Sequence, residues 1–191
     1  MGSFIRFLIQ RERGGKLDEG YARLANLIFK EEVNSPDSLK QASKGFCPTD
    51  AQFKSQFKEA RVGKAPLARY YLRSLEQTAI SEKYPEFVPN DDIVVTLEHI
   101  MPKQLHESNW PNTTEQDIET HCNRIGNLCL LTVDKNTKLG NESFEEKKRV
   151  YSQSSFTLTK NLADFKGWGI DDIEKRQTML ADLAVKTWKI D

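Results

Sequence analysis

The amino-acid sequence predicts an α+β fold that is mainly α-helical. Apolar residues recur at three- and four-residue intervals over the first 85 residues and again near the end of the chain, which is typical of amphipathic helices. Between these regions, residues 93–97 are β-branched and residues 128–132 are apolar, and both short runs favour strands. The expected order is therefore strand, loop, strand and helix, set among further helices.

Size and composition indicate an ordinary globular protein. The 191 residues carry 28 basic and 28 acidic side chains, and this length allows one domain with a substantial core. A mean hydropathy of −0.62 and the lack of a long apolar run argue against a membrane span. Cys47, Cys122 and Cys129 are odd in number and form no CxxC pair, which argues against a disulfide framework or a zinc–thiolate site. We expect a cytoplasmic protein.

The first region, residues 1–85, is expected to be a helical support. One helix is predicted over residues 17–30, a second begins at Thr49 or Asp50, and a third has Pro66 in its first turn. Residues 34–37, Asn-Ser-Pro-Asp, indicate a loop.

A local excess of positive charge lies in this helical region. Residues 40–73 contain eight basic and only two acidic side chains. Such a stripe is typical of a surface that binds a polyanion, and a solvated helical face is the alternative. The candidate polyanion-binding residues within it are Lys54, Lys58 and Arg61.

The second region, residues 86–191, contains both strands. A polar stretch over residues 103–120 indicates a loop with a short helix. A charged helix is predicted over residues 142–153, with Asn141 as its N-cap, and an amphipathic helix over residues 170–190.

The residue pair with the clearest chemistry is Glu98-His99, at the end of the first predicted strand. Pro102 follows closely and disfavours continued regular structure. Carboxylate and amide oxygens suit Mg²⁺ or Mn²⁺, and a neutral histidine can take a proton from water near pH 7. A cation and a base together are the minimum that phosphodiester hydrolysis needs. Read alone, however, the pair could be only an exposed strand end.

Three motifs occur in order along the second region: EHIMP at residues 98–102, RIGNLCLL at 124–131 and NESFEEK at 141–147. Together with Asn136, they resemble the HNH, or His-Me finger, nuclease domain. The specific similarity is to the C-terminal domain of GmrSD-type modification-dependent restriction enzymes and related phage-defence proteins. It covers roughly residues 65–190 and implies a ββα-metal finger, over about residues 92–153, that holds one divalent ion.

The resemblance implies a role for each matching residue. His99 would be the general base that activates water, and Asn127 would brace the finger loop and orient that histidine. Glu98, where many relatives have Asp, would be one metal ligand. Asn136 would be the second, with Asn141 as the alternative. The implied ion is Mg²⁺ or Mn²⁺, and no zinc is expected.

Three basic residues near the finger are expected to contact phosphate: Arg124, Lys138 and Lys147. A salt bridge is the alternative role for Arg124 and Lys147.

The resemblance implies a metal-dependent endonuclease or nickase that hydrolyses DNA, as the effector domain of a bacterial restriction or anti-phage defence protein. The expected partners are duplex DNA and an NTPase or sensor domain or subunit outside this chain, which has no GxxxxGK[ST] loop. No membrane partner is expected. The alternatives are a catalytically inactive DNA-binding or regulatory module and an RNA-cleaving nuclease.

Overall fold

The structure is a computed structural model that describes residues 5–6, 9, 14–44, 47–80, 94–104 and 108–190. The chain divides into two compact units, one of residues 58–183 and one of residues 1–57 with 184–191. The expected boundary between residues 85 and 86 lies outside the described residues.

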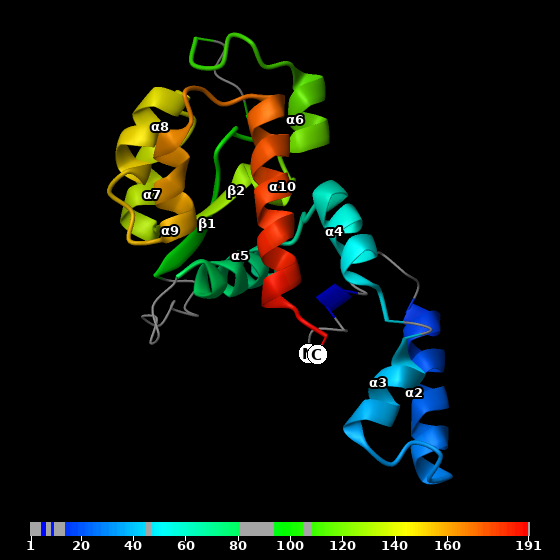
Figure 1. Ribbon diagram of the computed structural model, residues 1–191. Helices are drawn as coiled ribbons and strands as arrows, with labels where there is room; N and C mark the ends of the chain where they lie inside the picture. Colours follow the sequence, from blue (N-terminus) through cyan, green and yellow to red (C-terminus); the bar gives the residue numbers. More distant parts are fainter. Residues whose placement is uncertain are drawn as a thin grey trace. The chain divides into compact units, whose positions relative to one another are not determined.

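The smaller unit contains the helices α2 (Gly14–Phe29) and α3 (Pro36–Ser43) (Figure 1). Helix α2 confirms the helix predicted over residues 17–30. The loop predicted at residues 34–37 is confirmed for its first two residues, whereas Pro36 and Asp37 already belong to α3. Ser35 is the N-cap, and its side chain accepts a hydrogen bond from the Ser38 amide.

A buried arginine joins separate segments within the smaller unit. Arg6 is 1% exposed, its Nε donates to the Trp188 carbonyl at 2.8 Å, and its Nη2 lies 2.6 Å from the Asp50 carboxylate. Asp50 opens α4 (Asp50–Glu59), the predicted second helix, whose Phe53 packs edge-on against Trp188. Arg6 therefore links the two ends of the chain with the start of α4.

The larger unit is built on a hairpin of two antiparallel strands, β1 (Val95–His99) and β2 (Leu128–Thr132). Strand β2 has its predicted bounds. Strand β1 contains Glu98 and His99 rather than ending before them, because pairing with β2 continues as far as His99 opposite Leu128. The predicted α+β class with a majority of helices is confirmed.

The hairpin is followed at once by α7 (Val133–Leu139), which contacts both strands. The order strand, strand, helix is the topology expected for the finger, and Asn136 lies in the middle of α7. Whether the finger holds a metal stays a prediction.

Other helices and short 3₁₀ turns surround the hairpin. Helices α7, α8 and α9 gather on one side of it in Figure 1. The remaining elements are α5 (Ala65–Ala79), α6 (Glu115–His121), η1 (Ile125–Asn127), α8 (Phe144–Tyr151), α9 (Thr157–Lys160), η2 (Asn161–Asp164) and α10 (Ile170–Thr187).

Helices α8 and α10 confirm the helices predicted over residues 142–153 and 170–190 with shorter ends, whereas α9, η1 and η2 were not predicted. The N-cap of α8 is Ser143, whose side chain accepts a hydrogen bond from the Glu146 amide, so the prediction of Asn141 as N-cap is wrong. Among the described residues, no helix combines the length and the apolar composition needed to cross a membrane.

The two faces of the hairpin are both covered. Directly opposed residues of an antiparallel pair share a face, so Glu98 and Cys129 point to one side while His99 and Leu128 point to the other. The first side belongs to the main apolar core. That core contains Ile100, Met101, Trp110, Cys129, Leu131, Leu139, Phe144, Tyr151, Leu162, Trp168 and Ile173.

A buried arginine of α10 fixes the backbone that leads into β2. Arg176 is 4% exposed, and its Nη1 donates to the carbonyls of Gly126 at 2.6 Å and Leu128 at 2.8 Å. Burial lowers the pKa of Arg176, and the nearby Glu76 carboxylate opposes this effect. Glu76 in turn accepts a hydrogen bond from the Leu158 amide at 2.9 Å. This network ties α5, α9 and α10 to the start of β2.

Gly126 allows α10 to approach this turn closely. Its amide donates to the Gln177 side chain, and a Cβ at this position would overlap the Ile173 carbonyl oxygen. The same Cβ would lie 3.0 Å from the backbone amide nitrogen of Gln177. The glycine is required because backbone atoms of α10, which cannot move independently, occupy the space of a side chain.

We predict that Gly126→Ala lowers the free energy of unfolding by about 1–3 kcal/mol, because the added methyl group overpacks against backbone. Denaturant unfolding followed by circular dichroism measures the change. Gly167→Ala is the matched control, since nothing lies within 4 Å of a Cβ there, and it should change stability by less than about 0.5 kcal/mol. Equal stability of the two variants would contradict the packing argument.

Candidate active site

The turn that follows β1 is held by the side chain of Asn127, which is fully buried. Its Oδ1 accepts from the Met101 amide at 2.8 Å and from the Trp168 indole at 3.0 Å. Its Nδ2 donates to the carbonyls of Met101 at 2.9 Å and Cys122 at 3.1 Å. The Asn127 backbone carbonyl also accepts from the Ile100 amide at 2.9 Å. Asn127 therefore lies where it can brace the loop after His99, and it does so from the interior.

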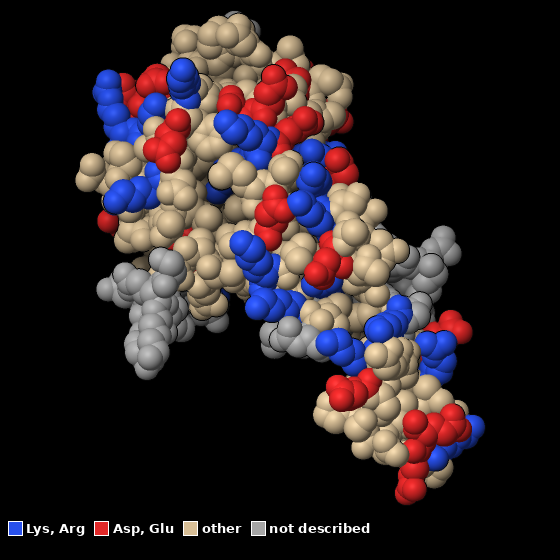
Figure 2. Space-filling model, in the orientation of Figure 1, with Lys and Arg blue, Asp and Glu red and all other residues tan. Residues whose placement is uncertain are grey.

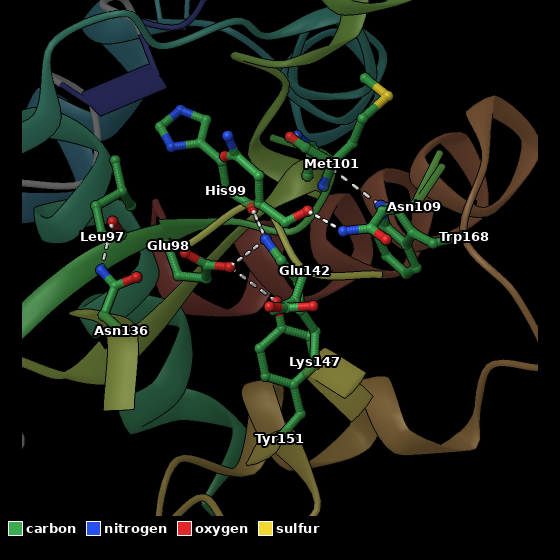
Figure 3. A network of polar contacts seen from close by, with 12 residues as sticks. Leu97, Glu98, His99, Met101, Asn109, Asn136, Glu142, Lys147, Tyr151 and Trp168 are labelled. Carbon is green, nitrogen blue, oxygen red and sulfur yellow. Dashed lines mark hydrogen bonds and ion pairs between the residues drawn. The ribbon is translucent and has the colours of Figure 1, made fainter. Parts of the chain in front are cut away.

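His99 is half-buried at the end of β1, and its ring points away from the Glu98 carboxylate (Figure 3). Its side chain forms a hydrogen bond with Asn123. Burial, and secondarily the charges of Lys103 and Lys147, lower the pKa of His99 from 6.5 to about 4, whereas the Asn123 bond opposes the shift. The imidazole is consequently neutral near pH 7, which is the form that can accept a proton.

Asn123 and Lys103 both lie near the His99 side chain. Neither was predicted from the sequence to be a site residue. Asn123 lies in the irregular segment between α6 and η1, where its carbonyl accepts from the Val62 amide at 2.7 Å. Its position beside His99 depends on this pairing between distant segments, so no local pattern could have revealed it. Lys103, four residues after His99, follows the EHIMP motif and is exposed.

Glu98 points into the core and forms a buried ion pair with α8 (Figure 3). Its Oε1 accepts from Lys147 Nζ at 2.7 Å and from the Tyr151 hydroxyl at 3.1 Å. The side chains of Lys147 and Glu98 are 0% and 7% exposed. Burial raises the pKa of Glu98, and the Lys147 charge and hydrogen bond oppose the rise. Removing one partner of such a pair typically costs about 3–5 kcal/mol, because the other charge stays buried without compensation.

Asn136 lies on the same side of β1 as Glu98. Its Nδ2 donates to Thr96 Oγ1 at 2.8 Å and to the Leu97 carbonyl at 3.2 Å. Thr96 and Glu98 are two residues apart on the strand and therefore share a face. The two predicted ligands thus lie along one face of β1, while His99 points to the other.

The predicted metal ligands differ in how far their side chains are already bound by protein groups. Asn136 keeps its amide oxygen for such an ion, because its hydrogen bonds to β1 use only the nitrogen. Glu98 instead uses Oε1 for Lys147 and Tyr151. Asn141 is exposed, and its carbonyl accepts from the Asn109 side chain at 3.2 Å. Within the described ranges, no group of three or more His, Cys, Asp or Glu side chains could hold a metal.

Two of the predicted phosphate contacts are ion-pair partners in the structure. Lys147 is paired with Glu98, and burial keeps its ammonium group away from the surface. Arg124 Nη1 lies 2.9 Å from the Glu59 carboxylate, and its Nη2 lies 4.0 Å from that of Glu174. Both arrangements correct the phosphate-contact assignment and favour the salt-bridge alternative. The side chain of Lys138 lies outside the described residues.

The residues of the basic stripe divide between the two units. Lys54 lies in the smaller unit, whereas Lys58 and Arg61 lie in the larger one. Arg61 is exposed, and its Nη2 donates to the Glu119 carbonyl. On the face shown in Figure 2, basic and acidic side chains are interspersed over the molecule. The described residues on that face form no broad area of a single charge.

Comparison with known families identifies the chain. The family model described as "GmrSD restriction endonucleases, C-terminal domain" matches residues 47–183, which is more than half of the chain. No curated protein gives a significant match. The matched segment contains His99, Asn127 and the ion pair of Glu98 with Lys147, and it confirms the resemblance drawn from the sequence motifs. The chain therefore belongs to the family of C-terminal domains of GmrSD restriction endonucleases.

Proposed function

We propose that this chain is an HNH-type endonuclease or nickase that hydrolyses DNA phosphodiester bonds, as the effector of a bacterial restriction or anti-phage defence system. The observation that supports it best is a neutral, half-buried imidazole at a rigidly held strand end, in a member of a restriction-endonuclease family. Duplex DNA is the proposed substrate, in keeping with that family.

In the proposed reaction, His99 accepts a proton from a water molecule while the water oxygen attacks the phosphorus atom. The bond from phosphorus to the leaving oxygen, in line with the attack, breaks, and that oxygen takes up a proton from solvent. Asn123 is a positioning residue, because its side chain interacts with the ring of His99. Asn127 is also a positioning residue, since its side chain contacts only protein groups in the interior. The exposed Lys103 supplies positive charge near the scissile phosphate. The need for Mg²⁺ or Mn²⁺ stays a prediction of the family resemblance.

We predict that His99→Ala slows nicking of supercoiled plasmid by at least about 100-fold, because the general base is lost. The assay measures conversion to open-circular DNA with Mg²⁺ or Mn²⁺ present, and EDTA should stop the parent. His121→Ala, which changes another histidine of the same unit, is the control and should cut at the parental rate. If His99→Ala cuts as fast as the parent, the mechanism is wrong.

The same assay separates the two alternative functions. Binding of DNA without cleavage under any divalent ion would indicate an inactive DNA-binding or regulatory module. Faster cleavage of an RNA of matched sequence would indicate an RNA nuclease.

The depressed pKa of His99 predicts a pH dependence of stability. The unfolded chain protonates this histidine below about pH 6.5, whereas the folded protein does so only near pH 4. The unfolded state therefore binds more protons between these values, and the stabilising contribution is lost as the pH falls. We expect the free energy of unfolding of the parent to fall more steeply from pH 6.5 to pH 4 than that of His99→Gln. Parallel curves from urea titrations would contradict the lowered pKa.

A final prediction concerns the path of the DNA. The amide of Val62, the residue after Arg61, donates a hydrogen bond to the carbonyl of Asn123, and Asn123 interacts with His99. Arg61 therefore belongs to a segment along which a phosphate backbone could reach His99. We expect the double variant Lys58→Ala/Arg61→Ala to bind duplex DNA more weakly at every salt concentration. The slope of log K against log salt concentration should fall by about 2, as two phosphate contacts are lost.

Fluorescence anisotropy over a range of NaCl concentrations measures this slope. The control is Lys160→Ala/Lys166→Ala, which removes two exposed lysines from α9 and the segment after η2. Equal salt slopes for both double variants would exclude Lys58 and Arg61 from the DNA interface.

A further inference from the structure

The buried cluster of Glu98, Lys147 and Tyr151 touches the backbone of the proposed base. Lys147 Nζ donates to the Glu98 carboxylate at 2.7 Å and also to the carbonyl oxygen of His99 at 2.9 Å. Lys147 and Tyr151 are four residues apart on α8, so one face of one helix supplies both donors to Glu98. The cluster therefore holds two consecutive residues of β1.

The charges in this cluster are costly to bury and add little net stability. A buried ion pair is often no more stabilising than apolar side chains of the same volume. Lys147 is fully buried, and its ammonium group donates to the Glu98 carboxylate and to the His99 carbonyl, which compensate its charge. The geometric effect of the pair is to fix the position of the strand end.

The turn after β1 is held from a second direction. Asn127 bonds to the backbone of Ile100 and Met101, directly after the carbonyl that Lys147 holds. With both sides of this backbone fixed, the main remaining freedom at His99 is rotation of its side chain, and Asn123 contacts that side chain.

We infer that Lys147 and Glu98 form a positioning pair for His99, and that Glu98 serves this pair rather than a divalent ion. This inference rests on the proposed function of His99 as a base. A divalent ion on Glu98 would have to lie close to the Lys147 ammonium group, which already contacts Oε1 and is fully buried. Repulsion between the two cations opposes that arrangement.

The test uses the charge-neutral double variant Glu98→Gln/Lys147→Met. Each single substitution leaves a buried charge unpaired and is expected to lower Tm strongly, whereas the double variant removes both charges and should melt within about 4 °C of the parent. We expect its kcat for plasmid nicking to fall by about 100-fold through misplacement of the imidazole, with KM for DNA unchanged. Parental kcat in the folded double variant would overturn the inference.

Lys148→Met is the matched control, because Lys148 is the next lysine on α8 and donates to the Phe165 carbonyl instead. It should leave kcat and the NMR signals of the His99 imidazole unchanged, whereas the double variant should shift those signals. The NMR comparison does not depend on catalysis, so it tests the inference even if the parent cuts no nucleic acid. Lack of cleavage by the parent would contradict only the proposed function. Unshifted imidazole signals in the double variant would show that the pair does not position His99.

Binding of Mn²⁺ tests the second half of the inference. Electron paramagnetic resonance titration of the parent and the double variant should give the same affinity, because Glu98 is not a ligand. Binding at least tenfold weaker in the double variant would assign Glu98 to the metal and overturn this half.

Discussion

The buried side chain of Asn127 is the interaction on which the candidate site depends. An amide group has two donor hydrogens and two acceptor lone pairs, and Asn127 uses all four on Met101, Cys122 and Trp168. Because the group is fully buried, water cannot replace any partner that is lost. One side chain therefore joins the turn after β1, the segment after α6 and the segment before α10.

Buried cations reinforce this arrangement through the backbone. Arg176 donates to the carbonyls on either side of Asn127, and Lys147 donates to the carbonyl of His99. Backbone carbonyls are fixed acceptors, so a cation that bonds to them also fixes the course of the chain. The carboxylates of Glu76 and Glu98 lie near these cations and compensate their charge.

The spacing of apolar residues predicted two of the helices and the second strand correctly. The helical periodicity of residues 17–30 and 170–190 and the apolar run of residues 128–132 all correspond to observed elements. The start of α3 was missed because Ser35-Pro36 suits a turn as well as a helix N-terminus. The end of β1 was misplaced because strand pairing, rather than composition, decides where that strand stops.

The candidate site was only partly predictable, because burial of charge is a tertiary property. His99 and Asn127 were identified through their motifs, and the structure places both at the end of the hairpin. Lys147 and Arg124 resemble surface cations in the sequence, since nothing local shows that Glu98 and Glu59 lie opposite them. Asn123 carried no signal, because its contact with His99 arises only when the segments around Val62 and η1 pair.

Strand alternation gives the two residues of the Glu98-His99 motif separate tasks. Adjacent strand residues face opposite sides, so Glu98 enters the core and His99 faces the side on which Asn123 contacts it. The longer side chain of glutamate suits this arrangement, because its extra methylene group extends the carboxylate from β1 toward Lys147 and Tyr151 on α8. An aspartate at this position would hold its carboxylate closer to the strand. Glutamate at this position therefore has a physical explanation in packing, and it does not by itself indicate a lost active site.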